Sequence, residues 1–331
     1  MSKKAYAIGN SSSEIVIERT TNRVLYAKNE HEKKYMASTT KILTAVVVIL
    51  HCNMSDIVTV SKDTTNIEGS SIYLEEGEKL TVLDLLYGLM LRSGNDCAET
   101  LAKHCCGSID KFAALMNETE KSIGANNSNF VNPHGLHDEN HYTTAYDLAL
   151  ISSEAMKNDT FRKIVSTKYI KIPFTTKNTN RYLSNKNKML SEFEGSNGIK
   201  TGYTKKAGRC LVSSCYRDDM ELICVVLNCP PMFEQSKNLL SDCFSKYKIF
   251  KLVESDEIIG FSKNTINGNN TALIINNDIN LPLTVDEKND IKIIYEYPLT
   301  ITRNLISGEE IGYVKIYCKN SLIFQEKIYT I

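Results

Sequence analysis

The sequence lacks net charge, and it lacks any hydrophobic run long enough to cross a membrane. Its 331 residues include 39 Lys and Arg against 39 Asp and Glu, so the formal charge is zero. Bulk electrostatics therefore favour neither nucleic acid nor an anionic membrane as a partner. The longest apolar run, Ile42 to Leu50, is well short of the roughly 18 residues that a membrane helix needs. With 42% hydrophobic and 24% charged residues, the chain can nevertheless build a packed core, which excludes a disordered polymer.

Targeting signals and metal-binding cysteine patterns are also missing. Residues 1–8 contain no apolar segment of the kind found in signal peptides. None of the ten cysteines forms a C-x-x-C pair. Four of them fall on apolar, strand-like segments, so we expect buried small hydrophobic residues rather than zinc ligands: Cys210, Cys215, Cys224 and Cys229. A chain of this length needs no disulfide framework, and the cysteines leave the redox compartment open.

The periodicity of apolar residues divides the chain into two parts. Before about residue 245, short strands stand at both ends and helices stand between them, which predicts an α+β domain with one shared antiparallel sheet. The expected strands are 6–8, 14–18, 24–27, 199–204, 210–216 and 221–229. The expected helices are 38–51, 81–91, 96–104, 109–122, 143–155 and 236–247. Beyond that point, short apolar stretches alternate with Asn, Asp and Gly turns, which predicts a small all-β domain. The predicted domains are 1–248 and 249–331.

Ser38 and Lys41 form an S-x-x-K pair at the start of the predicted buried helix. The i, i+3 spacing places both side chains on one helix face. A serine hydroxyl needs a base within reach, and a lysine is that base only when burial or a nearby cation lowers its pKa. The motif alone is weak, because Ser245 and Lys248 share the spacing and a solvated helix face is the common outcome.

Two further short motifs carry polar groups suited to a peptide substrate. Ser93-Gly94-Asn95 lies in a break between two predicted helices, where it supplies either a hydroxyl and an amide or an ordinary capping turn. Lys200-Thr201-Gly202 lies on a predicted strand. Its glycine admits a peptide as an added edge strand, and its Lys and Thr suit a terminal carboxylate. The alternative is an edge strand with a solubilising lysine.

Taken in this order, the three motifs resemble the set of penicillin-binding proteins and serine β-lactamases. The surrounding residues are similar to those of D-alanyl-D-alanine carboxypeptidases, which are low-molecular-mass penicillin-binding proteins, at 36–41, 69–71, 77–78, 86–96, 132–136 and 198–204. The resemblance covers about residues 5–247. It implies a β-lactamase/DD-peptidase-like domain, an antiparallel sheet with helices, followed by a small β-sandwich-like domain. Gly94 in the second motif and the lack of an E-x-x-L-N segment favour a carboxypeptidase over a β-lactamase.

The resemblance implies a catalytic role for each motif. Ser38 would attack the carbonyl between two D-alanines and form an acyl-enzyme, and Lys41 would take its proton. Ser93 would relay a proton to the leaving D-alanine, and Asn95 would hold the substrate amide. Water would then release the acyl group.

The third motif would bind the substrate. Lys200 would sustain the electrostatics of the site, and Thr201 would bind the terminal carboxylate. Gly202 would let the peptide backbone approach. The N–H groups of Ser38 and Tyr203 would form an oxyanion hole, which is worth about 10²–10³ in rate per donor.

The implied substrate is the peptidoglycan stem peptide, with β-lactams as covalent inhibitors and no cofactor, metal or nucleic acid. His134, His137 and His141 lie in a Pro/Gly turn, and we expect them to be structural rather than metal ligands. Because peptidoglycan lies outside the cytoplasmic membrane, we expect an extracytoplasmic enzyme whose signal peptide and membrane anchor are absent from this chain.

Two alternatives stay open at this point. The same residues are compatible with DD-endopeptidase, transpeptidase or weak β-lactamase chemistry. Outside enzymes, the chain would be a penicillin-binding sensor or wall-binding module that is acylated but hardly turns over.

Overall fold

The computed structural model describes residues 12–331, so the strand expected at 6–8 lies outside the described residues. The chain forms two compact units. The first consists of Met1–Arg217 with Glu221–Cys243, and the second of Asp218–Met220 with Phe244–Ile331.

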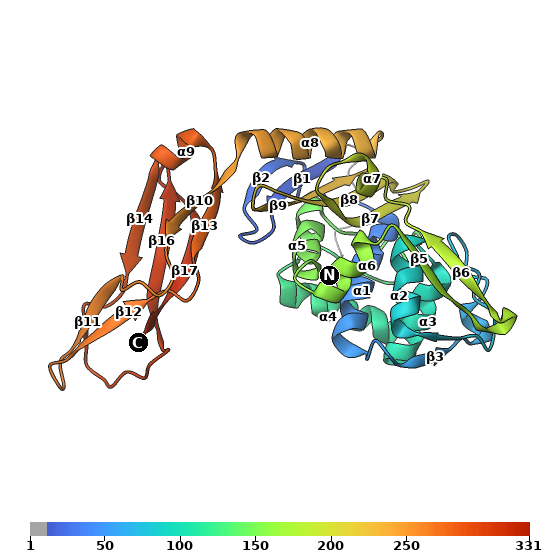
Figure 1. Cartoon of the computed structure of the whole chain (residues 1–331), viewed down its shortest axis with the longest axis horizontal. Coiled ribbons are helices and arrows are strands. Elements are labelled where there is room, and N and C mark those ends of the chain that lie inside the picture. Colours follow the sequence, from blue (N-terminus) through green and yellow to red (C-terminus); the bar gives the residue numbers. More distant parts are fainter. Residues whose placement is uncertain (1–11) are drawn as a thin grey trace, which may run out of the picture. The chain divides into compact units, whose positions relative to one another are not determined.

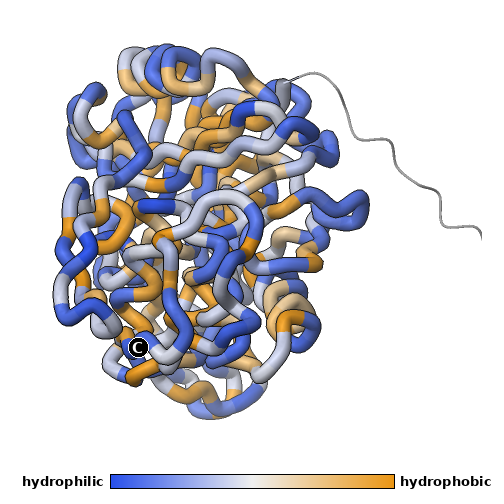
Figure 2. The backbone as a smooth tube through the Cα atoms, turned by 90° about the vertical axis from the view of Figure 1, so that its right-hand side faces the viewer, coloured by the Kyte–Doolittle hydropathy of each residue, from blue (hydrophilic) through white to orange (hydrophobic). Residues whose placement is uncertain are grey.

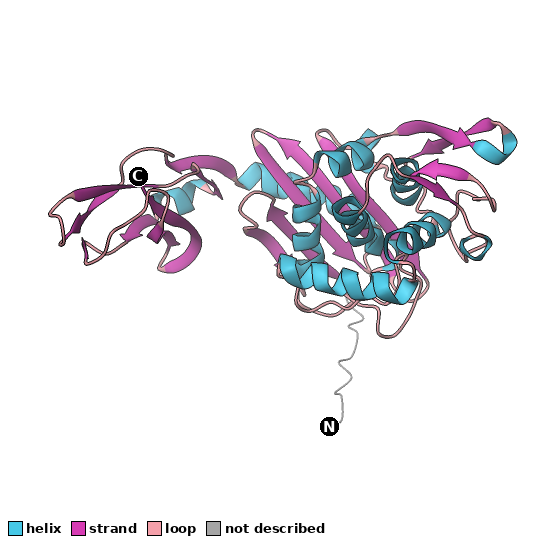
Figure 3. Ribbon diagram, turned by 90° about the horizontal axis from the view of Figure 1, so that it is seen from below, coloured by secondary structure: helices cyan, strands magenta, loops and turns pink. Residues whose placement is uncertain are grey.

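The first unit is built on a sheet with the strand order β2-β1-β9-β8-β7. Its strands are β1 (Ser13–Glu18), β2 (Val24–Lys28), β7 (Ser196–Thr204), β8 (Gly208–Arg217) and β9 (Met220–Leu227). β1 pairs antiparallel with both β2 and β9, so strands from the two ends of the unit share one sheet, as the sequence predicts. Every residue of β9 is buried, because helices cover both faces of the sheet (Figures 1 and 3).

Helix α8 covers one face of this sheet, and α1, α5 and α6 lie on the other side (Figure 1). The helices are α1 (Lys41–His51), α2 (Val82–Leu91), α3 (Asn95–Cys106), α4 (Ile109–Ile123), α5 (Ala145–Ala155), α6 (Asp159–Ser166), α7 (Met189–Glu192) and α8 (Met232–Lys246). Helix α1 is apolar all round and buried over most of its length, as expected for a central helix. In Figure 2, many of the outermost loops are hydrophilic.

Local signals set several helix ends where the sequence predicts them. The Thr81 side chain accepts a hydrogen bond from the Asp84 amide and Asp84 returns one, so a capping box opens α2. Helices α3 and α4 end at Gly107 and Gly124, which have the positive φ angles of 77° and 92° that favour glycine.

The structure corrects two expectations. The helix begins at Lys41 rather than at Ser38, because Ala37–Thr40 form a separate 3-10 turn, η1. The sequence analysis also missed α6 and the hairpin of β5 (Tyr169–Phe174) and β6 (Thr179–Ser184). β5 contains Pro173, and a proline within an apolar run weakens the prediction of a strand. Four short elements complete the unit: β3 (Ile57–Thr59), the 3-10 turn η2 (Lys62–Thr64), β4 (Lys79–Thr81) and the 3-10 turn η3 (Thr175–Lys177).

The second unit is almost entirely β-structure with its own core. Strands β10 (Lys248–Val253) and β13 (Ile279–Leu283) form a pair. A larger sheet has the order β14-β16-β17-β12-β11-β15. Its strands are β11 (Gly260–Asn264), β12 (Asn270–Ile274), β14 (Ile291–Glu296), β15 (Thr300–Ile301), β16 (Glu310–Cys318) and β17 (Ser321–Thr330). The exception is the short helix α9 (Val285–Asn289). The predicted fold class, an α+β domain followed by a small all-β domain, is confirmed.

Among residues 12–331, no helix has both the length and the hydrophobicity needed to cross a bilayer.

Candidate active site

The candidate site is centred on Lys41, the first residue of α1. Its Nζ lies 3.2 Å from the Ser38 Oγ and also donates to the Asn95 Oδ1 at 2.7 Å and to the His134 carbonyl at 2.6 Å. Burial is the main cause that lowers the pKa of Lys41 well below its usual value, and the Lys200 charge lowers it further. A lysine that is neutral near physiological pH is able to accept the proton of a serine hydroxyl.

Helix α3 begins with the second motif. The Asn95 side chain donates to the Glu68 carbonyl at 2.5 Å, and its backbone N–H donates to the Ser70 carbonyl at 2.7 Å. Ser93 is buried between α2 and α3 with a φ of 65°. Within residues 12–331 its hydroxyl makes no hydrogen bond, so it is available to a substrate.

The third motif lies on β7, the last strand of the sheet. The Lys200 Nζ donates to the Thr201 carbonyl at 3.0 Å. Burial, followed by the Lys186 charge, lowers the pKa of Lys200 to about 7. A Cβ placed on Gly202 would lie 3.1 Å from the Ser38 amide nitrogen, so the strand passes directly beside η1. The other long edge of β7 pairs with no strand among the described residues.

The two remaining predicted binding residues face outward to different degrees. Thr201 is half-buried, and Tyr203 is exposed, with the Arg209 guanidinium 5.4 Å from its ring centroid. The structure thus brings Ser38, Lys41, Asn95 and Gly202 into direct proximity. Contacts of Ser93, Thr201 and Tyr203 with substrate stay predictions.

The histidine turn forms a wall of the site. The His141 Nε2 lies 2.7 Å from the Thr40 Oγ1, and its Nδ1 accepts the Val131 N–H at 3.1 Å. Burial lowers the pKa of His141 to about 3, so the ring is neutral. The His134 carbonyl holds Lys41, and the His137 ring packs edge-on against Tyr35. Among the described residues, no three potential ligands are grouped as a metal site.

The predicted burial of four cysteines is confirmed: Cys210, Cys215, Cys224 and Cys229 are all buried. Sequence reasoning missed the contributions of Glu68, Ser70, Lys186 and the His134 carbonyl. Three of these act through backbone carbonyls, which carry no sequence signal. Lys186 follows β6 and donates to the Ser70 Oγ at 3.1 Å, and its charge lowers the pKa of both Lys41 and Lys200.

Comparison with known proteins identifies the family of the chain. The sequence profile of peptidase family S11, the D-alanyl-D-alanine carboxypeptidases, matches residues 2–230. The chain belongs to the D-alanyl-D-alanine carboxypeptidase family. The profile of the C-terminal domain of penicillin-binding protein 5 matches residues 247–331 of the same chain.

Individual members of the carboxypeptidase family are similar along most of the chain. DacF of Bacillus subtilis, a D-alanyl-D-alanine carboxypeptidase, is 34% identical over 259 residues, which are 75% of this chain and 66% of DacF. Penicillin-binding protein 5 from Haemophilus influenzae has a TM-score of 0.85 at 26% identity, covering 100% of this chain and 98% of that one. A DD-transpeptidase of Streptomyces K15 has a TM-score of 0.68 at 31% identity, covering 74% of this chain and 100% of that one. The predicted family is confirmed.

Proposed function

We propose that the chain removes the terminal D-alanine from peptidoglycan stem pentapeptides through an acyl-enzyme on Ser38. The observation that carries this proposal is the buried Lys41 Nζ, which lies 3.2 Å from the Ser38 Oγ, while the backbone N–H of Ser38 lies beside Gly202 of strand β7. This combination supplies a base, a nucleophile and a place for an extended peptide at one point.

The reaction has two steps. The Ser38 Oγ attacks the carbonyl carbon of the penultimate D-alanine while Lys41 takes the hydroxyl proton. The C–N bond then breaks, and the leaving D-alanine receives a proton by way of Ser93. Water next attacks the ester, releasing the shortened peptide and restoring the Ser38 hydroxyl. β-Lactams acylate Ser38 in the first step.

The binding roles follow from position. Asn95 holds the substrate amide, while Lys200 and Thr201 receive the terminal carboxylate. The N–H groups of Ser38 and Tyr203 stabilise the oxyanion. Support for this comes from the proximity of Gly202 to the Ser38 amide, which places β7 and η1 side by side.

The test is labelling with a fluorescent penicillin, beside a Ser38→Ala control, with the modified residue located by mass spectrometry. We expect label on Ser38 and none in the variant. A folded wild-type chain without label contradicts the acyl-enzyme mechanism.

A second candidate, transpeptidation, is favoured by one relative, since the similar Streptomyces K15 protein is named a DD-transpeptidase. Incubation of a pentapeptide with and without an acceptor amine separates the two. Free D-alanine with a shortened peptide supports the carboxypeptidase, and an amine-linked product supports the transpeptidase.

We also propose the roles of the two domains and the location of the enzyme. Residues 1–248 form the catalytic domain, and residues 249–331 form a separate β-domain. Because the proposed substrate lies outside the cytoplasmic membrane, the enzyme acts in the extracytoplasmic space.

A further inference from the structure

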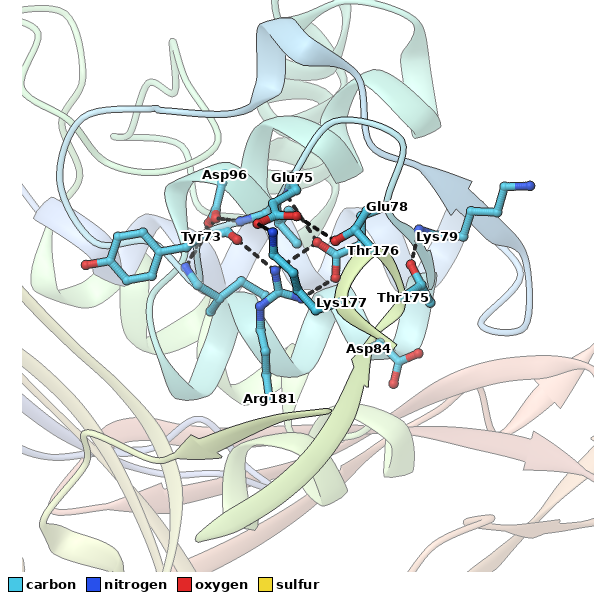
Figure 4. A network of polar contacts seen from close by, with 12 residues as sticks. Tyr73, Glu75, Glu78, Lys79, Asp84, Asp96, Thr175, Thr176, Lys177 and Arg181 are labelled. Carbon is cyan, nitrogen blue, oxygen red and sulfur yellow. Dashed lines mark hydrogen bonds and ion pairs between the residues drawn. The ribbon is translucent and has the colours of Figure 1, made fainter. Parts of the chain in front are cut away.

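A buried ion pair fastens the β5–β6 hairpin to the segment that holds Asn95 (Figure 4). The Arg181 guanidinium on β6 makes two hydrogen bonds to the Glu78 carboxylate, one of them at 2.8 Å. Its Nη2 also donates to the Tyr73 carbonyl at 2.7 Å, and the Phe174 ring lies 3.5 Å from the guanidinium carbon. Glu78 is fully buried and Arg181 nearly so.

Residues 68–78 are attached to the start of α3 on their other side. The Asp96 carboxylate accepts from the Ser71 hydroxyl at 2.6 Å and from the backbone N–H groups of Ile72 and Leu74. The carbonyls of Glu68 and Ser70 in turn receive the side chain and backbone N–H of Asn95. The segment therefore connects Arg181 to Asn95 through its backbone, with hydrogen bonds to Arg181 at one end and to Asn95 at the other.

Tyr73 shows that these contacts hold the segment against its local preference. Its φ is 60°, a left-handed backbone that bulky residues rarely adopt, and 81% of the side chain is exposed. The ring points away from the network in Figure 4 and gains no packing that would offset the strain. The bonds that hold its peptide groups are those from Arg181 to its carbonyl and from its N–H to the Ser71 Oγ at 2.7 Å.

We propose that Arg181 is a positioning residue for acylation: by clamping residues 69–78, it keeps the Asn95 Oδ1 in contact with Lys41. The inference rests on the proposed role of Lys41 as the base. Within the described residues, the Lys41 Nζ donates to only two oxygens besides that of Ser38. These are the Asn95 Oδ1 and the His134 carbonyl oxygen. Loss of the clamp loosens one of these bonds and admits water beside Lys41.

The consequence is a change in pH dependence as well as in rate. The charged or titratable groups facing Lys41 are Lys200 on β7, Lys186 after β6, Asp96 and Cys97 on α3, and the two histidines His134 and His141. Removing Arg181 leaves these groups in the chain, but entry of water lessens the desolvation that keeps Lys41 neutral. Its pKa then rises, and since acylation needs the neutral amine, the acid limb of the rate moves to higher pH.

The experiment compares Arg181→Met with Lys177→Ala. Lys177 forms the exposed pair with Glu75 at 3.1 Å in the same hairpin and leaves Arg181 untouched. We measure Ser38 acylation by fluorescent penicillin between about pH 5 and pH 9, together with the melting temperature. Arg181→Met is expected to slow acylation about 10- to 100-fold and to move its acid limb up by about half a pH unit or more. Lys177→Ala is expected to change neither.

A merely structural ion pair gives a different result. In that case Arg181→Met has a lower melting temperature, but the acylation rate of the folded variant and its acid limb stay at wild-type values. This outcome overturns the inference. If Arg181→Met does not fold, Arg181→Lys replaces it. That variant keeps the charge but loses the paired contact, so we expect a smaller shift in the same direction, and wild-type behaviour overturns the inference. Absence of label on the wild type overturns the proposed function and this inference together, whereas a labelled wild type with an unshifted variant overturns this inference alone.

Discussion

At the scale of residues, the proposed mechanism assigns different tasks to two buried lysines. Lys41 contacts Ser38, and Lys200 lies on the neighbouring strand with its amine on the Thr201 carbonyl. Burial lowers the pKa of both, because a charged amine is poorly solvated inside the protein. Lys41 needs to be neutral to act as a base, whereas Lys200 needs to be charged to attract a carboxylate.

These opposite needs predict a bell-shaped pH profile of kcat/KM on a D-Ala-D-Ala peptide. The rate rises as Lys41 loses its proton and falls above about pH 7 as Lys200 loses its charge. In Lys200→Arg the guanidinium stays charged, so the fall at high pH is expected to disappear even if the rate is lower overall. A basic limb that persists in this variant contradicts the assignment to Lys200.

At the scale of elements, strand β7 packs against the turn η1. Gly202 lies close to this turn, because an added Cβ would meet the Met36 carbonyl oxygen and the Ser38 nitrogen, both at 3.1 Å. These are backbone atoms, so they move only if the strand and the turn separate. The spacing between nucleophile and peptide-binding edge is therefore set here.

Gly202→Ala is expected to slow acylation of Ser38 by about 10-fold or more, because it separates β7 from η1. Stopped-flow measurement with fluorescent penicillin checks this. The melting temperature is expected to fall as well, since the added methyl group meets backbone atoms at a buried position. An unchanged acylation rate would show that η1 and β7 shift without disturbing the site.

Two buried carboxyl groups face one another between α4 and α5. Glu120 on α4 is almost fully buried, and one oxygen each of Glu120 and Asp147 lacks a hydrogen-bond partner among the described residues. Burial, followed by the Asp147 charge, raises the pKa of Glu120 to about 8. The folded state therefore keeps a proton that the unfolded chain releases at lower pH.

The free energy of unfolding should consequently fall as the pH rises from about 4.5 towards 8, because over this range the unfolded chain releases the Glu120 proton and the folded chain keeps it. Glu120→Gln removes the ionisation, so its melting temperature is expected to fall less over that range than that of the wild type. Glu118→Gln, at an exposed position of the same helix, is the control and should follow the wild type. Equal slopes for all three proteins would exclude this contribution.

At the scale of the whole molecule, the two units have separate hydrophobic cores. One core contains buried residues of β1, α1 to α6 and β7 to β9. The other contains buried hydrophobic residues between positions 253 and 328. All predicted catalytic and binding residues lie in the first unit. The similar Streptomyces K15 protein is matched over its whole length by 74% of this chain.

Residues 1–248 alone are therefore expected to fold and to acquire label on Ser38 at the rate of the full chain. Circular dichroism and fluorescent penicillin labelling test this. A fragment that folds but labels more than about 10-fold more slowly would show that the second unit contributes to the site. A fragment that does not fold would contradict the independence of the two cores.

Local signals in the sequence were sufficient for the family, the motifs and many elements. The capping box at Thr81, the glycines after α3 and α4 and the apolar run in α1 act through neighbouring residues, so periodicity reveals them. The β5–β6 hairpin was missed, because Pro173 within the apolar run of β5 argues against a strand and β6 is mostly polar and exposed.

Only the tertiary structure decided what surrounds the motifs. Lys41 meets Asn95 at a sequence separation of 54 residues and the His134 carbonyl at 93, and Arg181 reaches Glu78 across 103. Such contacts depend on how helices and strands pack, and several use backbone carbonyls that every residue possesses. Residue types and their spacing therefore determined which chemistry is possible, whereas packing determined the burial and the neighbours that set the pKa of each lysine.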